Sequence, residues 1–279
     1  MQVYLNGKFV DIKSAKIPVI DKGILYGYGI FETIKSYSSF LFLFDRHYKR
    51  LVKSLKEFRI DFSFSQEKIK KVILELLDRN SIKKEGYIRI TVTGDSNIFI
   101  IARKYKPLPK SYYEEGIKLK ISEFRRNRFS VLPYHKTLSY LENIFSKRQA
   151  EKNGYFETIF FDCQGKLAEG CTSNIFLVKD KNLLTPSVDC AILPGITREF
   201  VISIARKIGI KVIESKNINR NQLLSADEVF ITNSMIEILP VSEIENIRIG
   251  RKTPGDITKT LISEYKKEIF LEARYAKDN

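Results

Sequence analysis

The chain has 279 residues, of which 43% are hydrophobic, enough for a large buried core in one domain or two. Charged residues make up 29% with no long tract of one type, which argues against disorder. The net charge is +15, but the basic residues are interleaved with acidic ones, and the densest cluster, at 125–128, carries no nucleic-acid motif. We therefore expect a solvated lysine-rich surface or a positive cleft for a small anion, with nucleic-acid binding as a weaker alternative.

Targeting and metal signals are absent from the sequence. The densest apolar run near the N-terminus, Phe40–Phe44, is far too short to span a bilayer, and the first residues lack the basic-then-apolar order of a signal peptide. The three cysteines form no close pair, and the two histidines, His47 and His135, lie far apart. We expect a cytoplasmic protein with reduced thiols that binds neither a metal nor a membrane.

The first third of the chain has the pattern of an α+β unit with largely antiparallel strands. Asn6-Gly7 supplies a hairpin turn, because both residues tolerate positive φ. Asp45 is placed to cap a helix, and a second helix is expected over 65–80. The apolar faces of these helices are Tyr48, Leu51, Val52, Leu55 and Phe58, and Ile69, Val72, Ile73, Leu76 and Leu77. Strands are expected over 29–37, 40–44, 87–93 and 98–102.

A domain junction is expected within about 110–130, because residues 104–116 include two prolines and few aliphatic side chains. The chain is thus divided into a small N-terminal α+β domain at 1–120, a linker at 121–130 and a larger C-terminal domain at 131–279. Beyond the junction, helices are expected over 138–152 and 197–208, and strands over 156–161, 175–178, 211–213 and 228–232.

Three loops combine small and polar residues next to a predicted element. "AEGCTSNIF" sets Glu169 before a strand, "LPGITREF" leaves the amides of Ile196 and Thr197 free at a helix start, and "TNSMIEILP" follows a strand. Each alone is more typical of ordinary capping or turns. No P-loop or GxGxxG fingerprint is present, so the usual nucleotide sites are not indicated.

Taken together and in order, these pieces resemble the class IV pyridoxal-phosphate enzymes. That family includes branched-chain aminotransferases, D-amino acid aminotransferases and 4-amino-4-deoxychorismate lyases. The resemblance covers nearly the whole chain, through "VYLNGKFV", "DKGILYGYGIFETI", "DRHYKRL", "YHKTLSYLEN", "LAEGCTSNIFLV", "LLTP", "LPGITR" and "ADEVFITNSMIEILPV". It implies a two-domain fold type IV enzyme, α+β and α/β, with pyridoxal 5′-phosphate in the cleft between the domains. It also implies a homodimer in which a partner loop helps to close the site.

The resemblance assigns roles to individual residues. Lys136 would bind the cofactor covalently and later carry the proton, and Glu169 would face the pyridine nitrogen. Arg50 would grip the phosphate, with Arg46 as an alternative. The other cofactor-binding residues would be Tyr140, Ser173, Asn174, Ile196, Thr197, Asn233 and Ser234. The substrate side would be lined by Tyr26, Phe31, Thr33, Lys35, Tyr87, Arg89 and Met235, with Thr33 also catalytic.

Elementary chemistry is consistent with these roles. The covalent bond needs a neutral amine, which a desolvated lysine can supply and an arginine cannot. A carboxylate against the ring nitrogen keeps it protonated, so the ring can accept electrons. A phosphate suits a guanidinium fork and free helix amides. His135 and Cys171 are expected to have structural roles only.

The reaction is the open question. Thr33 stands where branched-chain enzymes usually have glycine and lyases have threonine, and both "KTLSYLEN" and the chain length favour the lyase, which releases pyruvate and 4-aminobenzoate in the folate pathway. "YIRI" and the lack of arginine-glycine after "TVTG" favour an aminotransferase that uses branched-chain L-amino acids or D-amino acids with 2-oxoglutarate. We place the lyase slightly ahead. A catalytically inactive binding protein is disfavoured, because Lys136, Glu169 and Arg50 are all present.

Overall fold

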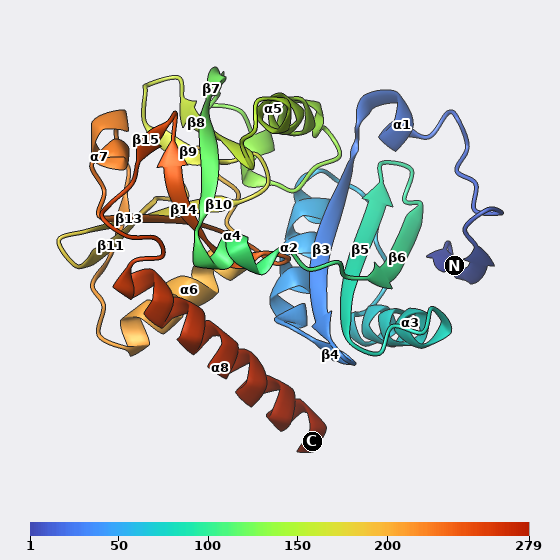
Figure 1. The fold of residues 1–279 in the computed structure, drawn as a ribbon. Coiled ribbons are helices and arrows are strands. Elements are labelled where there is room, and N and C mark those ends of the chain that lie inside the picture. Colours follow the sequence, from blue (N-terminus) through green and yellow to red (C-terminus); the bar gives the residue numbers. More distant parts are fainter. Residues whose placement is uncertain (279) are drawn as a thin grey trace. The chain divides into compact units, whose positions relative to one another are not determined.

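A computed structural model describes residues 1–278, with side chains to residue 275. The contacts divide the chain into two compact units, shown as ribbons in Figure 1. Unit 1 comprises Met1–Lys106, His135–Tyr140 and the end of the chain from Ile269, and unit 2 comprises Pro107–Tyr134 and Leu141–Glu268. The linker predicted at 121–130 overlaps strand β7 (Ile117–Arg126), all of which lies in unit 2.

Unit 1 is built on a six-stranded antiparallel sheet in the order β2-β1-β6-β5-β3-β4 (Figure 1). Its strands are β1 (Gln2–Leu5), β2 (Lys8–Asp11), β3 (Gly29–Tyr37), β4 (Phe40–Leu41), β5 (Glu85–Thr93) and β6 (Ile98–Lys104). Asn6 and Gly7 form the β1–β2 turn with φ of 46° and 93°, as the hairpin signal predicts. The antiparallel α+β character expected for the first third of the chain is confirmed.

The helices of unit 1 are α1 (Lys22–Tyr26), α2 (Phe44–Glu57) and α3 (Gln66–Arg79). α3 is confirmed in detail: Ser65 caps it by accepting from the Lys68 amide, and its five predicted apolar residues are buried. The prediction that Asp45 caps α2 is wrong. The strand predicted over 40–44 is also too long, because β4 ends at Leu41 and α2 begins at Phe44. The N-cap is Leu43 in the left-handed region, at φ 52°, so the helix already contains Asp45 in its first turn. Val52, which was predicted to lie on the buried face of α2, is exposed, whereas His47 is buried.

The segment around Lys136 belongs to unit 1 and pairs with β3. The Phe31 amide donates to the Lys136 carbonyl at 2.8 Å, and the Leu138 amide donates to the Gly29 carbonyl at 2.8 Å. The helix expected to start at Leu138 therefore begins only at Leu141, because residues 136–138 are extended against the edge of β3. Lys136 is anchored to the sheet rather than placed at a loop-to-helix junction.

Unit 2 contains a nine-stranded mixed sheet in the order β12-β11-β10-β13-β14-β7-β8-β9, with β15 added to β14. β7 pairs in parallel with β8 and β14, and β11 with β12. The strands after β7 are β8 (Glu157–Asp162), β9 (Leu167–Gly170), β10 (Asn174–Lys179), β11 (Asn182–Pro186), β12 (Val212–Ser215), β13 (Glu228–Asn233), β14 (Glu237–Ile244) and β15 (Ile247–Arg248). The sequence analysis missed β9, β11, β14 and β15.

The helices of unit 2 flank this sheet and include elements that the sequence analysis did not predict. They are α4 (Lys110–Glu114), a 3-10 turn (Leu132–Tyr134), α5 (Leu141–Lys152), α6 (Ile196–Lys207), α7 (Arg220–Leu224) and α8 (Asp256–Asp278), whose end from Ile269 counts with unit 1. α4, α7 and α8 were not expected. Within residues 1–278, no helix is long and apolar enough to cross a membrane.

Candidate active site

Lys136 lies over two aromatic rings of unit 1. Its Nζ is 4.4 Å from the centroid of the Phe31 ring and 5.7 Å from that of Tyr140, and the two rings meet edge to face at 5.4 Å. The lysine is partly buried. The predicted covalent role of Lys136 requires a neutral amine. Partial burial works in that direction, whereas ring faces attract a cation, so the role stays a prediction.

A buried carboxylate that sequence analysis missed organises Arg50. Glu32 of β3 accepts from Arg50 Nε at 2.7 Å and from Arg50 Nη2 at 2.8 Å, a two-point fork, and its Oε2 lies 2.8 Å from His47 Nδ1. Burial by itself would raise the pKa of the Glu32 carboxyl, but Arg50 and His47 outweigh it and hold that pKa at about 2. Arg50 is therefore held in one orientation, whereas Arg46 is exposed. This difference favours Arg50 as the phosphate ligand, which stays a prediction.

One face of the β3–β5 pair carries most of the residues predicted to contact substrate. Thr33 is paired in register with Arg89, and Lys35 with Tyr87. The Arg89 guanidinium lies 3.6 Å from the centroid of the Phe31 ring, so Arg89 and Lys136 both lie against this ring.

Two predicted substrate residues of unit 1 have other surroundings. Lys35 is buried and its charge is paired, with Nζ 3.2 Å from Glu85 Oε1. Tyr26, at the end of α1, is 72% exposed. Neither observation tests a role toward substrate.

Glu169 lies in unit 2, in a setting suited to a fixed negative charge. Its side chain is buried and its Oε2 accepts from the Leu193 amide at 3.0 Å and from Asn174 Nδ2 at 3.3 Å. Asn174 Nδ2 also donates to the Leu193 carbonyl at 3.0 Å. Two predicted cofactor residues, one at the end of β9 and one at the start of β10, are thus tied together next to α6.

The N-terminus of α6 has the geometry of an anion site. Its N-cap is Gly195, which offers no side-chain cap, and the structure gives the Ile196 and Thr197 amides no acceptor among the described residues. A Cβ on Gly195 would lie 1.8 Å from Asn174 Oδ1, so glycine is required by the close approach of the two loops. Free amides at the start of a twelve-residue helix suit a phosphate.

The turn after β13 contains two more predicted cofactor residues of unit 2, Asn233 and Ser234. Asn233 Oδ1 accepts from the amides of Met235 at 2.8 Å and Ile236 at 3.0 Å, which makes a tight turn around Ser234. Asn233 Nδ2 donates to the Thr172 carbonyl at 3.1 Å. Ser173, also predicted to bind cofactor, donates its hydroxyl to Glu157 at 2.8 Å.

The structure therefore gathers the predicted residues into two groups, one in each unit. Three residues that sequence analysis missed, Glu32, His47 and Glu157, support them. The available signal was a carboxylate at an inward-facing position of an otherwise apolar strand, which requires a buried partner.

His135 and Cys171 make the structural contacts expected of them. His135 Nδ1 lies 2.9 Å from Ser54 Oγ, and the ring meets Phe58 edge to face at 4.9 Å. Burial raises the pKa of the Cys171 thiol to about 12, so the thiol stays protonated and unreactive.

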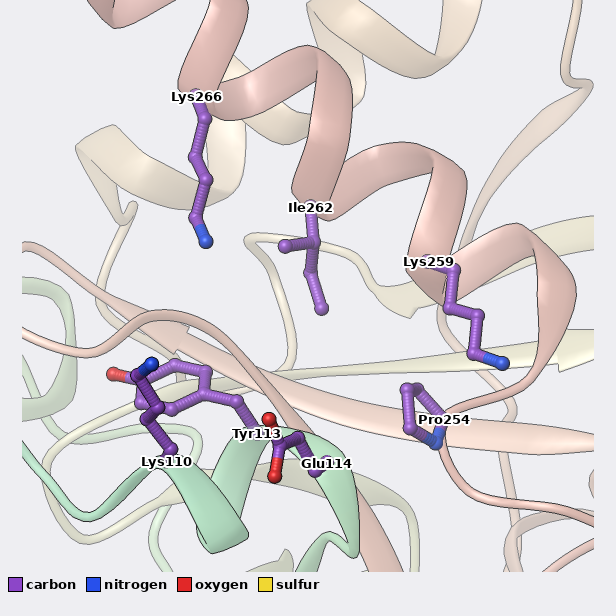
Figure 2. Close-up of a pocket in the computed structure, with 7 residues that line it drawn as sticks. All are labelled: Lys110, Tyr113, Glu114, Pro254, Lys259, Ile262 and Lys266. Carbon is purple, nitrogen blue, oxygen red and sulfur yellow. The ribbon is translucent and has the colours of Figure 1, made fainter.

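A separate pocket of about 350 Å³ lies in unit 2 between α4 and α8. Figure 2 shows Lys266 and Ile262 of α8 on one side and Tyr113 and Glu114 of α4 on the other. Its lining is Lys110, Tyr113, Glu114, Pro254, Lys259, Ile262 and Lys266, none of which was predicted to belong to the site. Among the described residues, no group of acids, histidines and cysteines could hold a metal.

Comparison with known proteins identifies the family. The profile described as "Amino-transferase class IV" matches residues 29–244. A Methanocaldococcus jannaschii protein with a provisional branched-chain-amino-acid aminotransferase name is 40% identical over 95% of this chain and 96% of its own. The aminodeoxychorismate lyase of Bacillus subtilis is 34% identical over 96% and 94% of the two chains, and the D-alanine aminotransferase of Bacillus licheniformis 30% identical over 98% of each. The chain belongs to the class IV aminotransferase family.

Solved structures confirm the fold type. The branched-chain aminotransferase of Thermoproteus uzoniensis with norvaline has a TM-score of 0.88 at 32% identity, covering 96% of this chain and 94% of that one. The T.th. branched-chain aminotransferase with pyridoxamine 5′-phosphate has a TM-score of 0.89 at 28% identity, covering 95% and 93%. The predicted fold type IV architecture, enzyme class and pyridoxal-phosphate cofactor are therefore confirmed at the level of the family.

The residues present fit that cofactor. Glu169 offers an ionisable carboxylate for a ring nitrogen, the α6 amides offer donors for a phosphate, and Lys136 offers an amine. The role of each residue stays a prediction.

Proposed function

We propose that the protein is a 4-amino-4-deoxychorismate lyase, which releases pyruvate and 4-aminobenzoate. The observation that carries this proposal is Thr33, a hydroxyl on β3 opposite Arg89 and on the same face as Phe31, the ring over which Lys136 lies. A glycine at this position could relay no proton. Arg89 adds a second cation against the Phe31 ring, which suits a substrate with two carboxylates.

In this proposal the protein supplies proton transfer and orientation. Bound pyridoxal phosphate would act as the electron sink for the substrate carbon that loses its proton. Lys136 Nζ takes the proton from the carbon that carries the amino group, and the C–O bond at the neighbouring carbon breaks, which makes the ring aromatic. The leaving enolpyruvate gains one proton, relayed by Thr33 Oγ1, and becomes pyruvate. Atoms and electrons balance without a second substrate.

An aminotransferase is the second candidate, and it is supported by the names of several relatives. Arg89 of "YIRI" lies against Phe31, a position that suits a substrate carboxylate in either reaction. Such an enzyme differs in its stoichiometry, because it needs an oxo acid to complete each cycle. It would act on branched-chain L-amino acids or D-amino acids with 2-oxoglutarate.

The first prediction separates the two reactions. The holoenzyme given aminodeoxychorismate alone should release pyruvate and 4-aminobenzoate in equal amounts over many turnovers. Thr33→Val should lower that rate by about 10²–10⁴-fold, the usual contribution of a proton-transfer group, while Thr33→Ser retains most of it. Both products are measured by chromatography. Glutamate formed from leucine or D-alanine with 2-oxoglutarate, without 4-aminobenzoate from aminodeoxychorismate, would reject the lyase.

We also propose that the working form is a cytoplasmic homodimer that has no nucleic-acid partner. The segment 19–26, which ends in α1, is largely exposed. No residue of α1 is buried, and Val19 and Ile20 just before it are 80% and 75% exposed. The segment is held rigidly, because Asp21 is buried and accepts from Gly23, Thr93 and Asn97. A fixed apolar surface of this kind favours a protein partner.

The second prediction tests this assembly. Wild-type protein should sediment as a dimer, and Val19→Asp/Ile20→Asp should sediment as a monomer, because charges buried at an interface lack partners. Ile247→Asp, at an exposed apolar position on β15, is the matched control and should remain dimeric. A monomeric wild type, or a double variant that is still dimeric, would contradict the proposed interface.

A further inference from the structure

Glu157 is a buried carboxylate that neither the family resemblance nor the proposed reaction uses. It is the first residue of β8 and has no exposed surface. Among the described residues, no lysine, arginine or histidine forms an ion pair with it. A buried carboxylate without a cation lowers the free energy of unfolding unless hydrogen bonds compensate it. The donors that surround Glu157 therefore indicate what the residue does.

The carboxylate fixes the turn between β9 and β10. Glu157 Oε1 accepts from the Thr172 amide and from Thr172 Oγ1 at 2.9 Å, and Oε2 accepts from Ser173 Oγ at 2.8 Å. All three contacts are donors directed at one acidic group. The Ser173 hydroxyl therefore uses its one hydrogen-bond donor on Glu157.

The same turn holds the loop around Ser234. The Thr172 carbonyl accepts from Asn233 Nδ2 at 3.1 Å. Asn233 in turn accepts from the amides of Met235 and Ile236, which sets the shape of the turn. A shift of Thr172 would thus move the backbone around Ser234.

The other side of the turn holds the start of α6. Asn174 follows Ser173 directly, and its Nδ2 donates to the Leu193 carbonyl at 3.0 Å. Its Oδ1 lies so close to Gly195 that a Cβ there would be 1.8 Å away. The Ser234 turn and the start of α6, both predicted to face the phosphate, thus contact the turn between β9 and β10. The centre of that turn is hydrogen-bonded to Glu157.

We propose that Glu157 is the positioning residue of the phosphate site: it clamps Thr172 and Ser173, and through them sets the spacing between the Ser234 turn and the α6 amides. It does not touch the cofactor. The inference rests on the proposed cofactor site and holds for a lyase or an aminotransferase. Ser173 acts as part of the clamp and not as a phosphate ligand.

The third prediction tests the clamp with ligands that differ only in the phosphate. Full-length protein freed of cofactor is titrated with pyridoxal 5′-phosphate and, separately, with pyridoxal, and the visible absorbance is followed. Glu157→Gln keeps the size but turns one acceptor into a donor that faces donors. It should weaken pyridoxal-phosphate binding by about 10- to 100-fold, the effect of losing a hydrogen bond to a charged group, and leave pyridoxal binding unchanged.

Asp162→Asn is the matched control. Asp162 ends the same strand, is equally buried, and accepts from the amides of Gln164 and Lys166, both at 2.9 Å, in the turn that leads to β9. It differs in one respect, because its Oδ2 also lies 3.7 Å from Arg128 Nη1. This variant should lose comparable thermal stability while both affinities stay at the wild-type value. If Glu157→Gln does not fold, Thr172→Val takes its place, because it removes one of the donors to Glu157. Thr172→Val must then weaken the binding of pyridoxal 5′-phosphate more than the binding of pyridoxal.

Three results would overturn the inference. The first is a Glu157→Gln protein that binds pyridoxal phosphate as wild type does, and the second is equal weakening for both ligands, which would indicate a general collapse of the site. The third is a Ser173→Ala variant that loses more phosphate-dependent affinity than Glu157→Gln, because Ser173 would then bind the phosphate itself. A wild-type protein that gives no visible band with pyridoxal phosphate would instead refute the cofactor site.

Discussion

Lys136→Ala should abolish the visible absorption band of the cofactor-bound protein and lower turnover by at least about 10²–10⁴-fold, because the variant loses both the covalent anchor and the proton carrier. Lys136→Arg should lose the band as well. Arginine keeps a positive charge over the Phe31 ring but does not give up its proton, so it cannot supply a neutral amine. Absorbance spectra and steady-state rates of the purified holoenzymes provide the measurement.

The control for this fourth prediction is Lys104→Ala, at an exposed lysine near the end of β6. It should keep both the band and the rate. A Lys136→Arg protein that retains the band would show that another amine bonds to the cofactor. A Lys136→Ala protein with wild-type turnover would remove Lys136 from the reaction altogether.

Elements defined by local pattern could be predicted from the sequence with accuracy. α3 has a strong helical period and a serine cap, and β3 is bounded by a glycine and a turn, so the expected and observed limits nearly coincide. The family motifs also assigned roles to Lys136 and Glu169, which stay predictions. In these cases, the information lies within a few neighbouring residues.

Non-local interactions decided the elements that the sequence analysis missed. Residues 136–138 have a helical-looking pattern but are extended, because β3 has an open edge about a hundred positions earlier in the chain that accepts them. The cap of α2 shifted to Leu43 because the chain turns there in the left-handed region. Tertiary pairing determines the first of these features, and the backbone turn at Leu43 determines the second.

The supporting carboxylates were missed for the same reason. Glu32 and Glu157 each sit among apolar strand residues, and nothing nearby in sequence identifies their partners, Arg50 and Thr172. The two acids nevertheless have parallel tasks. Each is buried, and each fixes the orientation of a group expected to face the cofactor phosphate, one in unit 1 and one in unit 2.

Glu32→Gln should lower the free energy of unfolding at pH 7 by about 3–5 kcal/mol, the usual cost of breaking a buried ion pair by removing one partner. The substitution leaves the Arg50 guanidinium facing a neutral amide in a partly buried position. Glu75→Gln is the matched control, because it breaks a glutamate–arginine pair with Arg79 in the same unit whose side chains are 46% and 42% exposed. That variant should lose no more than about 1 kcal/mol.

This fifth prediction also has a definite pH dependence. The pKa of Glu32 falls from an ordinary value of 4.5 to about 2 on folding. A lowered carboxyl pKa contributes stability that is fully present above the unfolded value and is lost as the pH falls through the folded value. The gap in unfolding free energy between wild type and Glu32→Gln should therefore be largest near neutral pH and shrink from pH 4.5 toward pH 2.

His47 adds an earlier step in the same direction. Burial lowers the pKa of His47 below its ordinary 6.5, and although Glu32 opposes this shift, Arg50 and Lys136 add to it, so the neutral form is favoured in the fold. Its contribution is therefore present above pH 6.5 and declines as the pH falls through the lowered value. Urea unfolding of wild type, Glu32→Gln and Glu75→Gln at pH 7, 5 and 3 would measure the Glu32 step as a change in this gap. A gap that stays constant across these three values would contradict an ionised Glu32 at the centre of the pair.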